Sequence, residues 1–193
     1  MSAVMHEEDW IARHRITVDE YYRMAEVGLL APEARVELID GVIIDKAPIG
    51  SRHAGTVTRF DRLLLRAVGD QAIVRVQQPV RLSRSSEPQP DVSLLRPRPE
   101  DYTRAHPRPE DALLVVEVSD TTLRYDREVK VPLYARHGIP ELWIVDLVGG
   151  QMHFFRSPQA GKYSDVSSTE EPSVVRLATL SDATVDLSGI LSP

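Results

Sequence analysis

The sequence predicts a mixed α/β protein, in which a central mixed β-sheet is flanked by helices. Residues 112–118 form a nearly continuous apolar run, which is typical of a central strand covered on both faces. Segments with apolar residues at helical spacing alternate with short strand-like segments, in the order helix, hairpin, helix, strands, helix, strand. That order favours helices packed against a mixed sheet.

The N-terminal half begins with a helix, a hairpin and a second helix. Thr17 and Glu20 have the spacing of a capping box that begins a helix, and Gly28 marks its end. Asp40-Gly41 separates two strand-like segments within 35–46, which is the strongest short-range signal of a β-hairpin. Ser51 is expected to cap an amphipathic helix that Gly69 ends.

The rest of the chain predicts the sheet and one more helix. A helix is expected from about residue 123 to residue 137, and Pro132 should kink it. Residues 96–109 are rich in proline and charge and predict an exposed loop that could reach toward a partner. Beyond residue 157 only short strand-like patches such as 174–177 are visible. The predicted strands are 72–82 (two strands broken near Pro79), 91–95, 112–118, 141–147 and 151–156.

Composition narrows the function classes. At 193 residues the chain predicts one domain over 1–193, with 1–14 and 158–193 peripheral. The absence of cysteine excludes disulfides, zinc–thiolate sites and a cysteine nucleophile. A net charge of −6 argues against a non-specific nucleic-acid coat but still allows a nuclease with carboxylates around a metal. Without an apolar run of membrane length or a signal peptide, we expect a cytoplasmic protein without a membrane partner.

Two acids are candidates for a metal site. Glu117 interrupts the apolar run at 112–118, where an ionised carboxylate is costly unless an arginine, a hydrogen-bonded network or a metal ion compensates it. Asp91 follows Pro90 and begins another apolar strand. Two such carboxylates at one sheet edge would suit Mg²⁺. The alternatives are a strand cap for Asp91 and a structurally paired acid for Glu117.

Lys130 is the candidate cation. It is one of only three lysines and falls in the helix expected after the Glu117 strand. Asp126, Lys130 and Tyr134 are four residues apart and share one helical face, so Lys130 could reach a phosphate beside the metal. An exposed Asp126–Lys130 ion pair is the alternative.

Glu37 and His53 are weaker candidates. Glu37 lies between apolar neighbours on the first hairpin strand, which a solvated strand face would also explain. His53, near the start of the second helix, could touch phosphate or be an ordinary surface residue. The sequence has no glycine-rich phosphate loop, no serine nucleophile elbow and no His-Glu-x-x-His pair.

Several strings together resemble the Uma-two family of restriction-endonuclease-like proteins, within the PD-(D/E)XK nuclease superfamily. The resemblance extends over roughly residues 15–157, with the expected order and spacing. The strings are Arg35-Val-Glu-Leu-Ile-Asp-Gly41, Ala47-Pro-Ile-Gly-Ser-Arg-His-Ala54, Glu87-Pro-Gln-Pro-Asp91, Leu114-Val-Val-Glu-Val-Ser119, and the stretch from Tyr125 to Asp146.

The resemblance implies a core sheet of four or more strands and phosphodiester hydrolysis assisted by Mg²⁺ or Mn²⁺. It implies that Asp91 is the acid of the Pro-Asp motif and that Glu117 is the second acid, with Glu37 as an additional metal ligand. Ser119 stands where the superfamily pattern has its lysine, so Lys130 is expected to take that role. Ser119, His53, Asp126 and Tyr134 are accessory candidates.

Three functions follow as hypotheses. The first is a metal-dependent endonuclease, with DNA as its expected nucleic-acid partner and a homodimer as its expected form. The second is a catalytically inactive nuclease fold that serves as an interaction or DNA-binding module, which Ser119 and the acidic charge favour. The third is a metal-dependent hydrolase of a substrate other than nucleic acid, which the absence of a basic tract favours.

Overall fold

The computed structural model describes residues 13–31 and 33–192, which form two compact units. Of the described residues, the first unit comprises 13–31, 33–46 and 83–87, and the second comprises 47–82 and 88–192. Residues 1–12, most of the N-terminal segment expected to be peripheral, lie outside the described residues. The single domain over 1–193 stays a prediction.

The first unit contains helix α1 (Val18–Glu26) and the hairpin of β1 (Val36–Ile39) and β2 (Val42–Asp45). The capping box is confirmed, because Thr17 and Glu20 satisfy each other's backbone amides. The hairpin is confirmed as well: Asp40 and Gly41 both have positive φ, 50° and 74°, as a tight two-residue turn requires. A Cβ at Gly41 would lie 2.6 Å from that of Arg15, so glycine is also needed for space.

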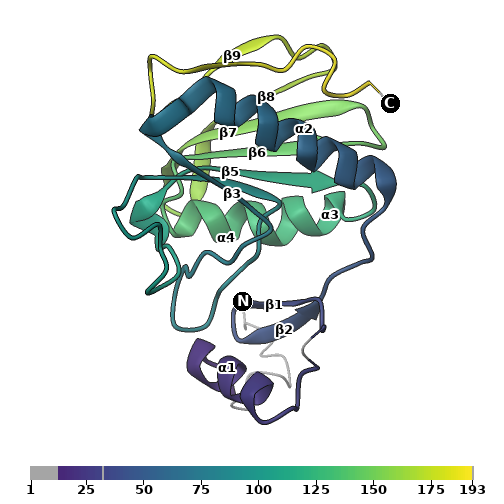
Figure 1. Cartoon of the computed structure of the whole chain (residues 1–193). Helices are drawn as coiled ribbons and strands as arrows, with labels where there is room; N and C mark the ends of the chain where they lie inside the picture. Colours follow the sequence, from purple (N-terminus) through teal and green to yellow (C-terminus); the bar gives the residue numbers. More distant parts are fainter. Residues whose placement is uncertain (1–12, 32, 193) are drawn as a thin grey trace, which may run out of the picture. The chain divides into compact units, whose positions relative to one another are not determined.

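The second unit is built on a six-stranded sheet with the order β3-β4-β5-β6-β7-β8 (Figure 1). Only β5 and β6 pair in parallel, and the other neighbours are antiparallel. The predicted mixed α/β class, with a central mixed sheet flanked by helices, is confirmed. The strands are β3 (Ile73–Val76), β4 (Val92–Leu95), β5 (Ala112–Ser119), β6 (Glu141–Asp146), β7 (Gln151–Gln159) and β8 (Lys162–Thr169).

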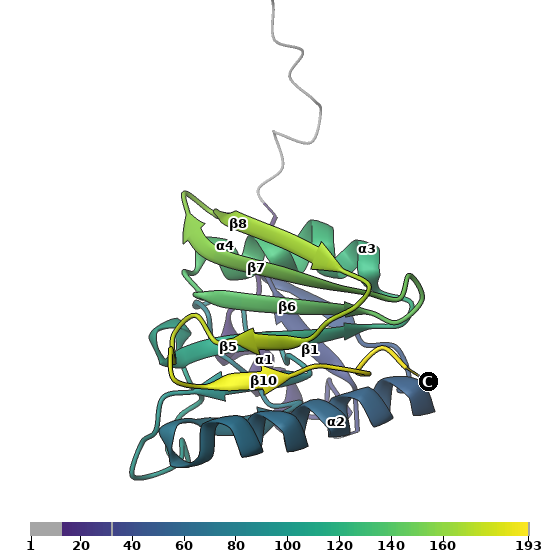
Figure 2. The same ribbon diagram turned by 90° about the horizontal axis from the view of Figure 1, so that it is seen from above.

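Two layers cover the two faces of this sheet (Figures 1 and 2). Helix α2 (Ser51–Val68) covers one face together with the hairpin of β9 (Val174–Arg176) and β10 (Thr184–Asp186). The other face carries the crossover from β5 to β6, which consists of α3, a π-helical segment and α4. These are Leu123–Tyr125, Asp126–Lys130 and Val131–Arg136, and two short 3₁₀ turns span Gly69–Gln71 and Pro109–Asp111.

The main core lies between the sheet and the α2 layer. Phe60 of α2 is fully buried, and its ring lies 6.4 Å from that of Trp143 in β6. Residues 158–193, expected to be peripheral, contribute apolar side chains to this core. They are Leu177, Ala183, Val185, Leu187 and Ile190. Within the described part of the chain, no helix has both the length and the apolar character needed to cross a bilayer.

Three local expectations differ from the structure. The second strand within 72–82 is absent, because Val80 and Arg81 donate backbone hydrogen bonds to the irregular residues Pro88 and Pro107. Gly50, rather than Ser51, precedes the first turn of α2, and no side chain caps it. Strand β8 was not expected, because its side chains are mostly polar and exposed and so give no apolar alternation.

We expect Phe60→Ala to lower the free energy of unfolding by about 3–5 kcal/mol, because the removed ring leaves a cavity against Trp143. Urea denaturation followed by circular dichroism measures this loss. Leu65→Ala on the same helix is the control: Leu65 is 50% exposed, so its truncation should change stability by less than about 0.5 kcal/mol. Equal losses in the two variants would contradict this position of the core.

Candidate active site

The pairing of β4 with β5 brings the two predicted acids together. In this antiparallel register Val92 lies opposite Val116, so the position before Val92 lies beside the position after Val116. These positions are Asp91 and Glu117. Val116 and Val118 belong to the α2 core, so Glu117 between them points to the α3–α4 side of the sheet. Both acids are buried, with 6% and 3% of their surface exposed.

Three donors hold the Asp91 carboxylate. Its Oδ2 accepts the backbone N–H of Val118 at 2.9 Å and the Nε2–H of His53 at 3.1 Å, and its Oδ1 accepts Gln77 Nε2 at 3.3 Å. A carboxylate only accepts hydrogen bonds, so this contact assigns the proton to Nε2 of His53. The first turn of α2 and the end of β3 thereby fix the orientation of Asp91.

Opposing effects set the ionisation of Asp91. Burial raises the pKa of this carboxyl group. The hydrogen bond and charge of His53, the Val118 amide and the charge of Lys130 together lower the pKa by more than burial raises it. The net pKa lies below its ordinary value, so Asp91 is an anion at neutral pH. An anionic oxygen is the ligand that a hard divalent cation requires.

Glu117 is held by the crossover on the sheet's α3–α4 side. Lys130 Nζ donates to Glu117 Oε1 at 3.0 Å, and the Tyr134 hydroxyl donates to the same oxygen at 2.7 Å. The ion pair is almost dry, because the side chains of Lys130 and Glu117 are 5% and 4% exposed. Two charges removed from water in this way are tolerated only when each compensates the other.

A π-helical turn presents Lys130 to the strand. Val131 N–H donates to Asp126 O, five residues back, so this turn is wider than that of an α-helix. Pro132 follows at once and has no N–H for an α-helical bond to residue 128. The shared face of Asp126, Lys130 and Tyr134 is confirmed, since all three are buried and contact β5. The alternative of an exposed Asp126–Lys130 pair is wrong.

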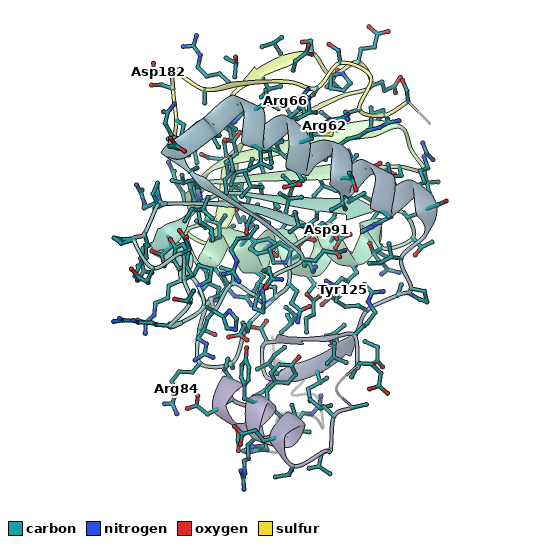
Figure 3. All side chains as sticks on the ribbon, viewed as in Figure 1. Arg62, Arg66, Arg84, Asp91, Tyr125 and Asp182 are labelled. Carbon is teal, nitrogen blue, oxygen red and sulfur yellow. The ribbon has the colours of Figure 1, made fainter. Side chains whose placement is uncertain are left out.

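The crossover is also tied to the end of β5 at Ser119. Ser119 Oγ donates to Asp126 Oδ2 at 2.8 Å, and Thr122 Oγ1 donates to the same oxygen at 2.6 Å. Ser119, the residue in the place of the superfamily lysine, therefore holds the segment that carries Lys130. In Figure 3, Asp91 is labelled in the region of the sheet and Tyr125 in that of the crossover.

The predictions for His53 and Glu37 can be compared with their positions in the structure. His53 is not an ordinary surface residue, since its side chain is 14% exposed and contacts Asp91. Glu37 lies in β1 of the first unit and is 2% exposed, so the solvated-face alternative is wrong. Its membership of a metal site stays a prediction. The sequence analysis missed Gln77 and Thr122; the signal for Gln77 was its place directly after a strand that pairs with the Asp91 strand.

The donor set at these strands fits a magnesium-type ion. Mg²⁺ in proteins is commonly bound by one or two carboxylates, with water and substrate phosphate oxygens completing its shell. Asp91 and Glu117 supply two carboxylates in adjacent register positions. Among residues 13–31 and 33–192, no three histidine or acidic side chains are grouped to hold a metal. Water and substrate phosphate oxygens would complete the shell around such an ion.

Comparison with known proteins agrees with this geometry. A family model, Uma2, described as "Putative restriction endonuclease", matches residues 18–188. The chain belongs to the Uma2 family. The resemblance inferred from the sequence strings is thereby confirmed, and membership of Uma2 supports a nuclease, a hydrolase that acts on nucleic acid.

A solved structure similar to this Uma2 chain is that of "a putative nuclease belonging to DUF820" from Anabaena variabilis. The TM-score is 0.71 at 19% sequence identity, and the match covers 92% of this chain and 98% of that one. At that identity the likeness shows the fold alone. A search of the curated proteins finds no sequence match.

We expect Lys130→Met to lower the free energy of unfolding by about 3 kcal/mol or more, because Glu117 is then buried without its counter-charge. Equilibrium urea denaturation at neutral pH gives the value. The double variant Glu117→Gln, Lys130→Met should recover part of the loss. Lys162→Met serves as the control, since Lys162 is exposed. A single variant as stable as this control would refute a compensated buried pair.

His53→Phe should raise the pKa of Asp91, because burial remains while a hydrogen bond and a charge that lower it are lost. The folded pKa lies below the unfolded one, so ionised Asp91 stabilises the fold at pH values above its unfolded pKa. This contribution disappears as the pH falls through the folded pKa. Carbon-13 NMR titration of the carboxyl group follows the shift, and His14→Phe is the control. An unchanged Asp91 titration in His53→Phe would contradict the assignment.

Proposed function

We propose that this Uma2 protein is a metal-dependent endonuclease that hydrolyses phosphodiester bonds in DNA. One observation carries the proposal: two buried acids occupy neighbouring strand positions, and an equally buried lysine lies 3.0 Å from one of them. An arrangement of this kind is costly for stability, and perturbed charged groups of this kind cluster at functional sites. The Uma2 family supports a nuclease reaction for it.

Asp91 and Glu117 are the residues that would hold the ion. Mg²⁺ or Mn²⁺ bound there would polarise the scissile phosphate and lower the pKa of an attacking water. The low pKa of Asp91 keeps its oxygens anionic for this purpose. His53 and Gln77 act as positioning residues, because they fix both oxygens of that carboxylate.

Lys130 is the proposed catalytic cation. Its ammonium group neutralises Glu117 and would stabilise negative charge that develops on a phosphate at the same acid. Tyr134 holds the shared Glu117 oxygen from the next helical turn, which limits the movement of the acid. Ser119 and Asp126 anchor the segment and so orient the lysine.

The contact between Lys130 and Glu117 supports catalysis over the inactive module that Ser119 alone suggests. A serine in place of the strand lysine would abolish catalytic activity only if no other cation reached Glu117, and Lys130 does reach it. The Uma2 match likewise supports nucleic acid over another substrate. A homodimer, which would offer one site to each strand of a duplex, is part of the proposal.

Purified protein should cleave plasmid DNA when Mg²⁺ or Mn²⁺ is added, and a chelator should abolish cleavage. We expect Asp91→Asn and Glu117→Gln to lower kcat by about 100-fold or more, because each removes charge that the reaction needs. Asp70→Asn is the matched control, since Asp70 is an exposed acid just after α2. Linear DNA and RNA in parallel reactions define the substrate.

Calorimetry with Mn²⁺ provides a second measurement on the same variants. Binding that both Asp91→Asn and Glu117→Gln abolish, and that Asp70→Asn leaves intact, agrees with the proposal. Equal trace cleavage by wild type and Asp91→Asn would show that the nuclease comes from a contaminant and would end the catalytic interpretation.

A further inference from the structure

Helix α2 carries four arginines along one side. At 100° per residue, these arginines lie within an arc of about 80°. Gly55 falls within the same arc, and no acidic residue does. We call this set the arginine stripe; its members are Arg52, Arg59, Arg62 and Arg66.

The arginine stripe has no carboxylate partner among the described residues. Arg52, Arg62 and Arg66 are exposed, and the structure gives none of them a side-chain hydrogen bond or ion pair within that part of the chain. Arg59 donates to the backbone carbonyls of Gly189 and Ser192, which carry no net charge. Asp61, the one acid of α2, projects about 140° away from the centre of the stripe. The positive charge therefore remains available to an external anion.

The stripe begins one residue before His53 of the candidate active site. The imidazole of His53 contacts Asp91, and at 100° per residue His53 projects about 140° from the centre of the stripe. The stripe therefore starts at the end of α2 that carries the site and runs along the solvent side of that helix. The helix then continues for 14 residues to Arg66, a length of about 21 Å at 1.5 Å per residue. Figure 3 shows Arg62 and Arg66 along α2, which covers the sheet face opposite to the crossover.

We propose that the arginine stripe binds the phosphate backbone of the duplex DNA that extends beyond the cleavage site. This inference rests on the proposed function. Guanidinium groups pair with phosphate oxygens through two parallel hydrogen bonds. A run of about 21 Å corresponds to roughly six base-pair steps at 3.4 Å each.

Two further observations fit a DNA backbone. A Cβ at Gly55 would have no atom within 4 Å, so this stretch of the helix surface is open and lets a ligand approach the backbone closely. The whole chain has a net charge of −6, so a local positive stripe would orient a polyanion that the rest of the surface repels.

The salt dependence of DNA binding tests the stripe directly. Binding of a fluorescent duplex is measured by anisotropy in the presence of a chelator, at several salt concentrations. The triple variant R52Q/R62Q/R66Q retains Arg59 for its structural contacts. It should reduce the magnitude of the slope of log K against log salt by about 2.7, because each lost phosphate contact contributes about 0.9. The control R23Q/R136Q/K162Q removes the same charge from exposed positions elsewhere and should leave the slope near that of the wild type.

A single position gives an independent test with matched side chains. Gly55→Glu and Gly55→Gln introduce groups of equal size into the open space of the stripe. Only the glutamate adds a negative charge, so it should weaken duplex binding well beyond the glutamine variant. Equal affinities for the two variants would overturn the proposal.

The outcomes separate this proposal from the proposed nuclease activity. If both triple variants reduce the slope of log K against log salt by the same amount, the stripe does not bind the duplex. The same holds if R52Q/R62Q/R66Q cleaves DNA with wild-type salt dependence. In both cases the nuclease assignment stands. If the stripe variants alone lose duplex binding but wild type shows no Asp91-dependent cleavage, the stripe is supported and the nuclease function fails. Loss of binding to anionic lipid vesicles, with unchanged binding to DNA, would also overturn the proposal.

Discussion

The buried ion pair between Glu117 and Lys130 is the constraint to which the rest of the second unit conforms. Glu117 lies in a strand that is buried along its whole length, where an unpaired charge would cost several kcal/mol. Its counter-charge comes from the crossover, and a wide π-helical turn brings that lysine within 3.0 Å. Tyr134 and the Ser119–Asp126 contact then hold the crossover in place. The π-helical turn in the crossover thus allows the regular strand β5 to contain a buried acid.

The two acids differ in the donors that hold their carboxylates. Asp91 is surrounded by donors on separate elements, and His53, Gln77 and the Val118 amide keep its pKa low despite burial. Glu117 instead accepts hydrogen bonds from Lys130 and Tyr134 at one oxygen, and these two donors belong to the same crossover. One carboxylate is thereby fixed by the α2 and β3 side of the fold and the other by the crossover. A shared ion would join these two parts of the second unit.

The sequence predicted what local patterns encode and missed what depends on tertiary contacts. The apolar run around Glu117, the periodicity of α2 and the Asp40-Gly41 turn each fix an element by themselves, and the spacing of Asp126, Lys130 and Tyr134 gave their shared face. Strand β8 was missed because an exposed edge strand needs no apolar alternation. Gln77 was missed because its role depends on a left-handed backbone, with φ of 50°, that turns its amide toward Asp91. The sequence left the group that compensates Glu117 open among an arginine, a hydrogen-bonded network and a metal ion, because tertiary contacts decide which side chains reach a buried acid.

The parallel pairing of β5 with β6 has a consequence for how the proposed site could be lost. Parallel neighbours must be joined by a connection that crosses over the sheet, and here that connection carries both Lys130 and Tyr134. Transient opening of the crossover would withdraw the cation from Glu117 and strip cover from the sheet in the same event. Loss of the proposed site and exposure to proteases are therefore coupled, and a conformer without that site would also be a short-lived one in a cell.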